Sequence, residues 1–138
     1  MKKYIVFLLL IASCTSKPNK AMIRISLTDS SRSLKITGIG DDILQEINRD
    51  SVTTGWLSLI PVYRMPKDTD LKDFQPPQPG KYVVTDSVVV FTPDTPFMSQ
   101  QAYFVRYYQY DEGNDIMEYV QHRKKLGQVP FMDLVFKR

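Results

Sequence analysis

Cysteine and histidine are almost absent from this chain of 138 residues, which contains one of each. A single cysteine allows no intramolecular disulfide, so the chain is not a disulfide-stapled scaffold. Six glycines and nine prolines are too few for a collagen-like or low-complexity polymer. Apolar residues make up 43% of the chain and aromatic residues 12%. This composition favours a single folded domain whose core is built from β-branched and aromatic side chains.

The same shortage argues against most kinds of catalytic and metal site. His122 is the only histidine, and the three cationic residues that follow it, 123–125, disfavour its protonation and shape no obvious base. Structural zinc sites need four nitrogen or sulfur ligands, which the chain does not supply. Paired carboxylates of the kind that glycosidases use remain open, because spacing selects no pair. We therefore expect no catalytic residue, no bound metal and no cofactor, and a non-enzymatic protein.

Three aspartates in a proline-rich stretch have part of the spacing of a calcium-binding loop. They are Asp68, Asp70 and Asp73, but Lys72 stands at the fifth position, where an oxygen ligand is needed. No glycine follows at the sixth position. Solvated loop acids are the favoured interpretation.

The first 13 residues have the pattern of an export signal. Lys2 and Lys3 precede an apolar run over 4–11, and the small residues Ala12 and Ser13 follow it. As a helix, the ten residues 4–13 would cover about 15 Å of a hydrocarbon layer roughly 30 Å thick. The segment is therefore expected to be a cleaved signal peptide and not a membrane span.

The tetrapeptide Ile11, Ala12, Ser13 and Cys14 resembles the bacterial lipobox. The resemblance implies cleavage before Cys14, diacylation of its thiol and, usually, acylation of its new amino group. The alternative is an ordinary signal peptide that happens to end in a free cysteine. We expect residues 1–13 to be removed, 14–20 to form a lipidated N-terminus and polar tether, and 21–138 to form the domain. The membrane lipid reached through acylated Cys14 is the first expected partner.

Loss of the signal peptide changes the charge of the protein. Without Lys2 and Lys3, 16 basic residues face 15 acidic ones, so the formal net charge falls from +3 to +1. A nearly neutral domain lacks the basic footprint of nucleic-acid binding, and no nucleic-acid partner is expected. The tether lacks the acidic run of surface-exported lipoproteins of the Bacteroidota. That comparison favours an outer-membrane position facing the periplasm.

Alternating apolar and polar residues dominate the remainder of the chain and predict a mainly β fold. Strands are expected over 56–65, 103–110 and 131–136, with a hairpin over 81–92, while 23–27 and 34–36 are either two short strands or one strand broken by a turn or bulge. Pro61 should place its strand at a sheet edge or at a bulge, because proline cannot donate to a sheet ladder. Pro66–Gly80 is predicted to be a surface loop. Short helices are predicted around 43–47 and over 115–126.

Several residues between 60 and 110 resemble the bacterial Ig-like domains of surface-layer and lipoprotein chains. The pattern consists of Gly80 and Tyr82, the run 90–97 (Val-Phe-Thr-Pro-Asp-Thr-Pro-Phe), and Tyr103 with Val105. It implies an Ig-like β-sandwich in which Tyr103 forms a tyrosine corner. Trp56 would be the core residue between the sheets, on an early central strand. The chain departs from the pattern at Gln101, where a glycine is common, and in the predicted helix 115–126.

One face of the strand 103–110 is the candidate contact surface. Phe104, Arg106, Tyr108 and Tyr110 alternate on it, and together they could stack on a sugar or on a partner protein. The alternative is that the helix 115–126 or another strand covers this face. The cationic residues 122–125 could touch anionic lipid, although a solvated helix end is favoured.

Two functions therefore stand side by side. The first is a lipid-anchored, non-enzymatic interaction or accessory module whose partner is an unknown envelope protein. The second is a small-ligand or glycan binder that uses the aromatic face. The second requires Phe104, Tyr108 and Tyr110 to be open and coplanar.

Overall fold

A computed structural model describes residues 22–49, 53–109 and 129–138. Several predictions fall outside these ranges: the signal peptide, Cys14 and its tether, Tyr110, the helix 115–126 and His122. No helix within the described ranges is long and apolar enough to cross a membrane.

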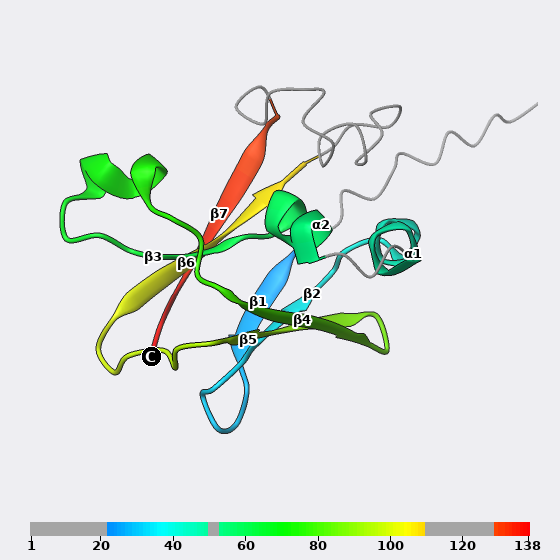
Figure 1. Ribbon diagram of the computed structural model, residues 1–138, viewed down its shortest axis with the longest axis horizontal. Coiled ribbons are helices and arrows are strands. Elements are labelled where there is room, and N and C mark those ends of the chain that lie inside the picture. The colour runs from blue at the N-terminus through cyan, green and yellow to red at the C-terminus, as the bar shows by residue number, and fades with distance from the viewer. Residues whose placement is uncertain (1–21, 50–52, 110–128) are drawn as a thin grey trace, which may run out of the picture.

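In these described ranges, seven strands form two antiparallel sheets (Figure 1). The first has the order β1-β2-β5-β4, with bounds Arg24–Leu27, Leu34–Thr37, Val88–Pro93 and Gly80–Thr85. The second has the order β3-β6-β7, with bounds Val62–Arg64, Ala102–Tyr108 and Phe131–Lys137. If the strands β1–β7 are lettered A–G, the two sheets have the orders ABED and CFG. These are the strand orders of the constant-type immunoglobulin fold. The predicted mainly β fold is confirmed, and the two sheets are compatible with the expected Ig-like β-sandwich.

The core lies between the two sheets, because alternate residues of each strand face inward. The first sheet contributes Leu34, Ile36, Val89 and Phe91, and β6 contributes Tyr103, Val105 and Tyr107. Phe97 links the sheets: its ring centroid lies 6.4 Å from that of Phe91 and 4.8 Å from that of Tyr103.

Tyr103 closes the corner between β5 and β6 as predicted. Its phenol oxygen accepts a hydrogen bond of 2.9 Å from the backbone N–H of Met98, five residues upstream. This bond ties the start of β6 to the connection that precedes it, as a tyrosine corner does.

Among the described residues, three short helices lie between the strands. The first, α1 (Asp41–Arg49), begins with two aspartates and buries Leu44 and Ile47, which confirms the predicted helix. The 3-10 helix η1 (Thr69–Phe74) lies within the predicted loop 66–80. The third, α2 (Thr53–Leu59), immediately precedes β3.

The predicted strand 56–65 is wrong over its first half. Residues 56–59 belong to α2, and only Val62–Arg64 form a strand. Trp56, Leu59 and Ile60 are buried at positions i, i+3 and i+4, which is the helical period. Trp56 is a core residue as predicted, but it lies on a helix, with its ring stacked 5.9 Å from Tyr82. Pro61 ends the helix, and β3 lies at a sheet edge as predicted.

The hairpin β4–β5 forms where it was predicted. Asp86 and Ser87 join its strands, and both have positive φ angles, 49° and 61°. Positive φ at both central residues is typical of the type I′ turn, whose twist matches that of the strands it connects.

Candidate interaction site on the outer face of the second sheet

The outer face of the second sheet carries the residues singled out on the strand 103–110. Phe104, Arg106 and Tyr108 alternate outward along β6, opposite Tyr103, Val105 and Tyr107 in the core. The register pairs these outward residues with Val135, Asp133 and Phe131 of β7. On the other side, Tyr63 of β3 stacks on Phe104 with ring centroids 5.0 Å apart.

An ion-pair network occupies the centre of this face. Arg106 donates to both carboxylate oxygens of Asp133, from Nε at 2.8 Å and from Nη2 at 2.9 Å. Its Nη2 also donates to Oδ1 of Asp73 at 2.7 Å, and Lys72 Nζ lies 2.7 Å from Oδ2 of Asp133. The two-point pairing of guanidinium and carboxylate is the strongest geometry for such a pair. The network fastens η1, which carries Lys72 and Asp73, to strands β6 and β7.

Aromatic rings surround both cations of the network. The guanidinium carbon of Arg106 lies 3.9 Å from the ring centroid of Phe131 and 5.6 Å from that of Phe104. Lys72 Nζ lies 4.6 Å from the Phe104 centroid. These positions are those of cation–π contacts, which add to the ion pairs where the cation is desolvated.

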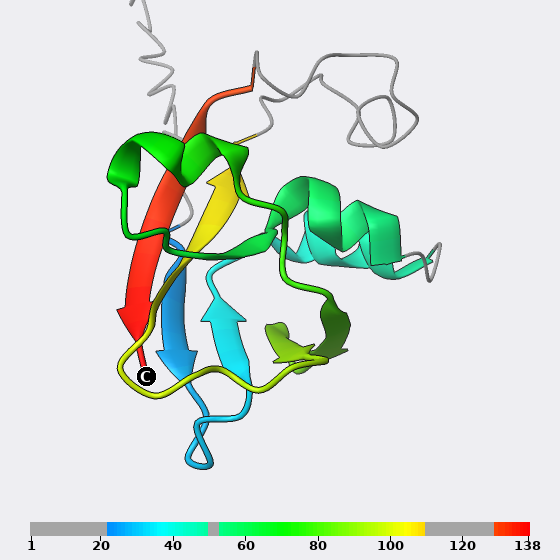
Figure 2. The ribbon, with the colours of Figure 1, turned by 60° about the vertical axis from the view of Figure 1, so that its left-hand side comes forward.

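The predicted open aromatic platform is therefore closed. Phe104 is fully buried and Arg106 is only 8% exposed, so Phe104 has no free ring face for a sugar. Among the described residues the cover is η1, which crosses the outer side of β6 and β7 in Figure 2; the predicted helix 115–126 lies outside the described ranges. Tyr108 is half-buried, and its ring meets that of Phe131 edge-on at 5.9 Å. The requirement that Phe104 and Tyr108 be open together is not met.

The charges of the network shift the pKa values of its members. Hydrogen bonding to Asp133 raises the pKa of Arg106 further above its usual range, against the opposing effect of burial. Burial alone would raise the pKa of Asp133, but the hydrogen bonds from Arg106 and Lys72 outweigh it and the pKa is lowered. Burial is the main reason why the pKa of Tyr63 is raised to about 12. Both members of the central pair are thus fixed in their charged forms at neutral pH.

The cover presents its own apolar side chains outward. Phe74 is 80% exposed and Leu71 50% exposed. In a 3-10 helix, residues i and i+3 lie on the same side, so Leu71 and Phe74 form one ridge. The ridge was not among the predicted contact residues, because Pro66–Gly80 was expected to be only a surface loop. The available signal was an apolar pair spaced by three within a proline- and aspartate-rich stretch.

The aspartates with partial calcium-loop spacing have structural contacts instead. Asp68 caps η1, where its Oδ1 accepts from the N–H of Asp70 at 3.0 Å, and Asp73 binds Arg106. Within the part of the chain that the structure describes, no three His, Cys, Asp or Glu side chains gather in a manner that could hold a metal ion.

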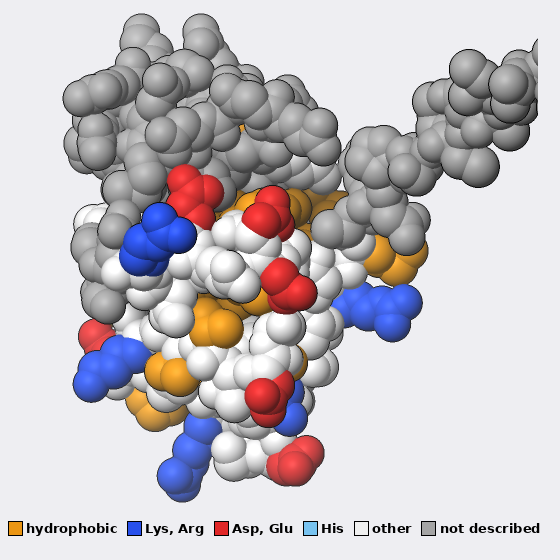
Figure 3. Space-filling view, turned by 90° about the vertical axis from the view of Figure 1, so that its right-hand side faces the viewer, with side chains coloured by type: hydrophobic (Ala, Val, Ile, Leu, Met, Phe, Trp, Pro, Cys, Tyr) orange, Lys and Arg blue, Asp and Glu red, His pale blue; other side chains and the backbone are white. Residues whose placement is uncertain are grey.

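The side of the molecule away from η1, where α1 and the hairpin β4–β5 lie, has a different character. Figure 3 shows acidic and basic side chains interspersed there, with small apolar areas between them. A surface of mixed charge is the ordinary solvated exterior of a domain. The ridge on η1 stands out against it.

Comparison of the chain with known proteins adds no relative. No family model matches it, and searches of curated proteins and of solved structures find no match.

Proposed function

We propose that this protein is a lipid-anchored lipoprotein of the bacterial cell envelope, and that its Ig-like domain is a non-enzymatic interaction module. One observation carries the proposal: the lipobox-like tetrapeptide Ile11–Cys14 ends a basic and apolar leader, and a β-sandwich follows it closely. A thioether to lipid requires a cysteine at this point, because the thiolate is the nucleophile. Two or three acyl chains would hold the protein firmly on a bilayer.

The short tether limits where the domain can act. Cys14 and Met22 are eight residues apart, a stretch that spans at most about 29 Å when fully extended. The domain is therefore held within about its own diameter of the membrane surface. Its partner is a component of the same envelope layer, and the absence of an acidic run after Cys14 favours the periplasmic side of the outer membrane.

The ridge of Leu71 and Phe74 is the surface that we assign to the partner. Exposed apolar side chains on a loop fastened by ion pairs are partly pre-organised for binding, because the backbone that carries them is already ordered and only the side chains lose freedom. A single protruding ring fits an apolar pocket on a protein, whereas a glycan would require an open, flat aromatic face. The partner class is therefore an envelope protein with an apolar pocket.

Fractionation of cells tests the anchor. The parent protein is expected with membranes and a Cys14→Ala variant in the soluble envelope fraction, and retention of the variant on membranes would refute the anchor.

Site-specific photo-crosslinking tests the ridge in the anchored protein. A crosslinker at position 74 should give a discrete protein adduct, and one at exposed Val83 on β4 should not. Loss of the adduct in a Leu71→Ser background would assign it to the ridge. Adducts with lipid alone, or equal adducts from positions 74 and 83, would contradict the assignment.

A further inference from the structure

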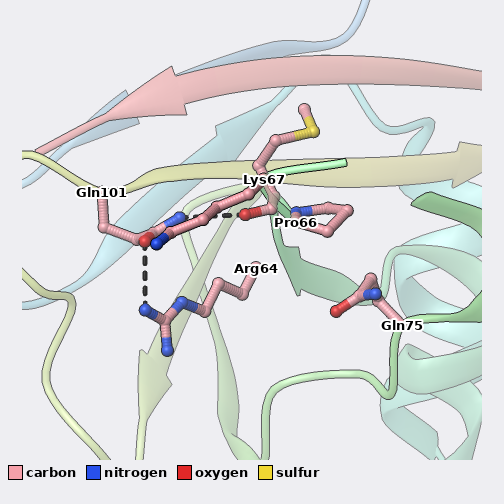
Figure 4. A pocket seen from close by; sticks show the side chains of 6 residues that line it. Arg64, Pro66, Lys67, Gln75 and Gln101 are labelled. Carbon is pink, nitrogen blue, oxygen red and sulfur yellow. Dashed lines mark hydrogen bonds between the residues drawn. The ribbon is translucent and has the colours of Figure 1, made fainter. Parts of the chain in front are cut away.

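A small hollow lies where the chain leaves β3, beside the start of β6 (Figure 4). Its volume is about 270 Å³, below the roughly 300–1,000 Å³ of pockets for drug-sized ligands. It can therefore hold a small group and not a large molecule. The residues that line it are Arg64, Met65, Pro66, Lys67, Gln75 and Gln101.

Gln101 holds the charged wall of the hollow in place. Its Nε2 donates to the backbone oxygens of Met65 at 3.0 Å and Ala102 at 2.8 Å, which uses both amide hydrogens. Its Oε1 therefore faces Arg64, whose Nη2 donates to it at 3.1 Å. Gln101 stands where the Ig-like pattern commonly has glycine, and a glycine could make none of these bonds. The departure from the pattern thus pre-positions a guanidinium at the rim of the hollow.

The hollow has a positive charge that the described part of the chain does not neutralise. Among the described residues, neither Arg64 nor Lys67 has a carboxylate within ion-pair distance. The nearest acid in sequence, Asp68, directs its Oδ1 to the N–H of Asp70. One N–H group of the Arg64 guanidinium bonds Gln101, so four of its five donors remain for a ligand.

We propose that this hollow binds a small oxyanion, a carboxylate or phosphate group, between Arg64 and Lys67. The planar guanidinium offers two parallel donors to such a group, and the ammonium adds a point charge. In Figure 4, Gln75 lies across the hollow from Gln101, so an amide borders the site on each side. The site borders the ridge, since Gln75 Nε2 donates to the backbone oxygen of Leu71 at 3.0 Å, and it does not depend on lipidation of Cys14.

Titration of the isotope-labelled full chain with inorganic phosphate, and separately with succinate, tests the proposal by nuclear magnetic resonance. Saturable shifts of the Gln75 and Gln101 side-chain amide signals and of Arg64 Nε are expected with at least one probe. The probe that binds distinguishes a phosphate from a carboxylate site. Arg64→Gln and Lys67→Gln should each weaken binding about tenfold, because each removes charged hydrogen bonds.

Lys35→Gln is the matched control, because it removes one positive charge from an exposed position on the other sheet. It should leave the affinity within about twofold. No saturable shift with either probe would overturn the proposal. Equal weakening by the Lys35 and Lys67 variants would also overturn it, since the effect would then be one of net charge. Arg64 and Lys67 are both exposed, so the variants at these positions should fold.

Discussion

Arg106 donates hydrogen bonds to both carboxylate oxygens of Asp133, and the same guanidinium donates one to Asp73 on η1. The two carboxylates differ sharply in exposure: the Asp133 side chain is 15% exposed and the Asp73 side chain 68%. Arg106 thus pairs with one mostly buried carboxylate, that of Asp133, and with one exposed carboxylate, that of Asp73. The relation explains how the loop 66–80 is held against a face that was expected either to be an open contact surface or to be covered by the helix 115–126 or another strand.

The two pairings should differ in their contribution to stability. Asp133→Asn leaves the buried Arg106 with only its exposed partner Asp73 and takes the carboxylate from Lys72, so it should lower the free energy of unfolding by about 3 kcal/mol. Asp73→Asn removes a solvent-screened partner and should cost less than about 1 kcal/mol. Urea unfolding of both variants measures the difference. Equal losses would show that the exposure of the carboxylate does not govern the strength of the pairing.

The lowered pKa of Asp133 predicts a loss of stability in acid. A carboxyl whose native pKa is below its unfolded value of about 4 stabilises the fold above that value. This contribution is lost as the pH falls through the lower native pKa. Between about pH 6 and pH 2, the unfolding free energy of the parent should fall more steeply than that of Asp133→Asn. Parallel curves for the two proteins would contradict the assignment.

Trp56 should contribute as a core residue although it lies on a helix. Trp56→Ala removes a buried ring stacked on Tyr82, and we expect a loss of about 3 to 5 kcal/mol. Val83→Ala, at an exposed position of β4, should change stability by less than about 0.5 kcal/mol. Thermal unfolding followed by circular dichroism compares the two. A loss below about 1 kcal/mol for the Trp56 variant would place the ring outside the essential core.

Gly80 is required by the close approach of β5. A Cβ at this position would lie 2.5 Å from the backbone oxygen of Thr92 and 2.6 Å from the Phe91 ring. Gly80→Ala should therefore cost about 1 to 3 kcal/mol through overpacking. Lys81→Ala, at the next and exposed position, should be close to neutral. Denaturant unfolding of the two variants measures their free energies of unfolding. Equal values would show that β4 and β5 can move apart to accept a Cβ without loss of stability.

Much of the fold could be predicted from period-two patterns and from the Ig-like motif. The hairpin β4–β5, the strands β6 and β7 and the Tyr103 corner formed where expected. The strand predicted from Trp56 failed because a short apolar run fits a buried strand and a buried helix equally well. The spacing of Trp56, Leu59 and Ile60 also fits a helix, and Pro61 indicates where that helix ends.

The candidate site was less predictable from the sequence. The alternation of residues along β6 shows which side chains share a face, but it does not show which segment packs over that face. Phe104 and Arg106 were placed on one face correctly. Their burial depends on Lys72 and Asp73, which lie more than 30 residues earlier in the chain. Nothing local to β6 indicates that a distant loop supplies the partners of its arginine. For the same reason, the exposed ridge on that loop and the hollow at its base emerged only from the structure.

Intact-mass measurement of the protein isolated from its membranes decides whether Cys14 joins the β-sandwich to lipid. We expect a chain that begins at Cys14 and is heavier than its amino-acid sequence by two or three acyl chains. An unmodified thiol at Cys14, or a chain that retains residues 1–13, would contradict it.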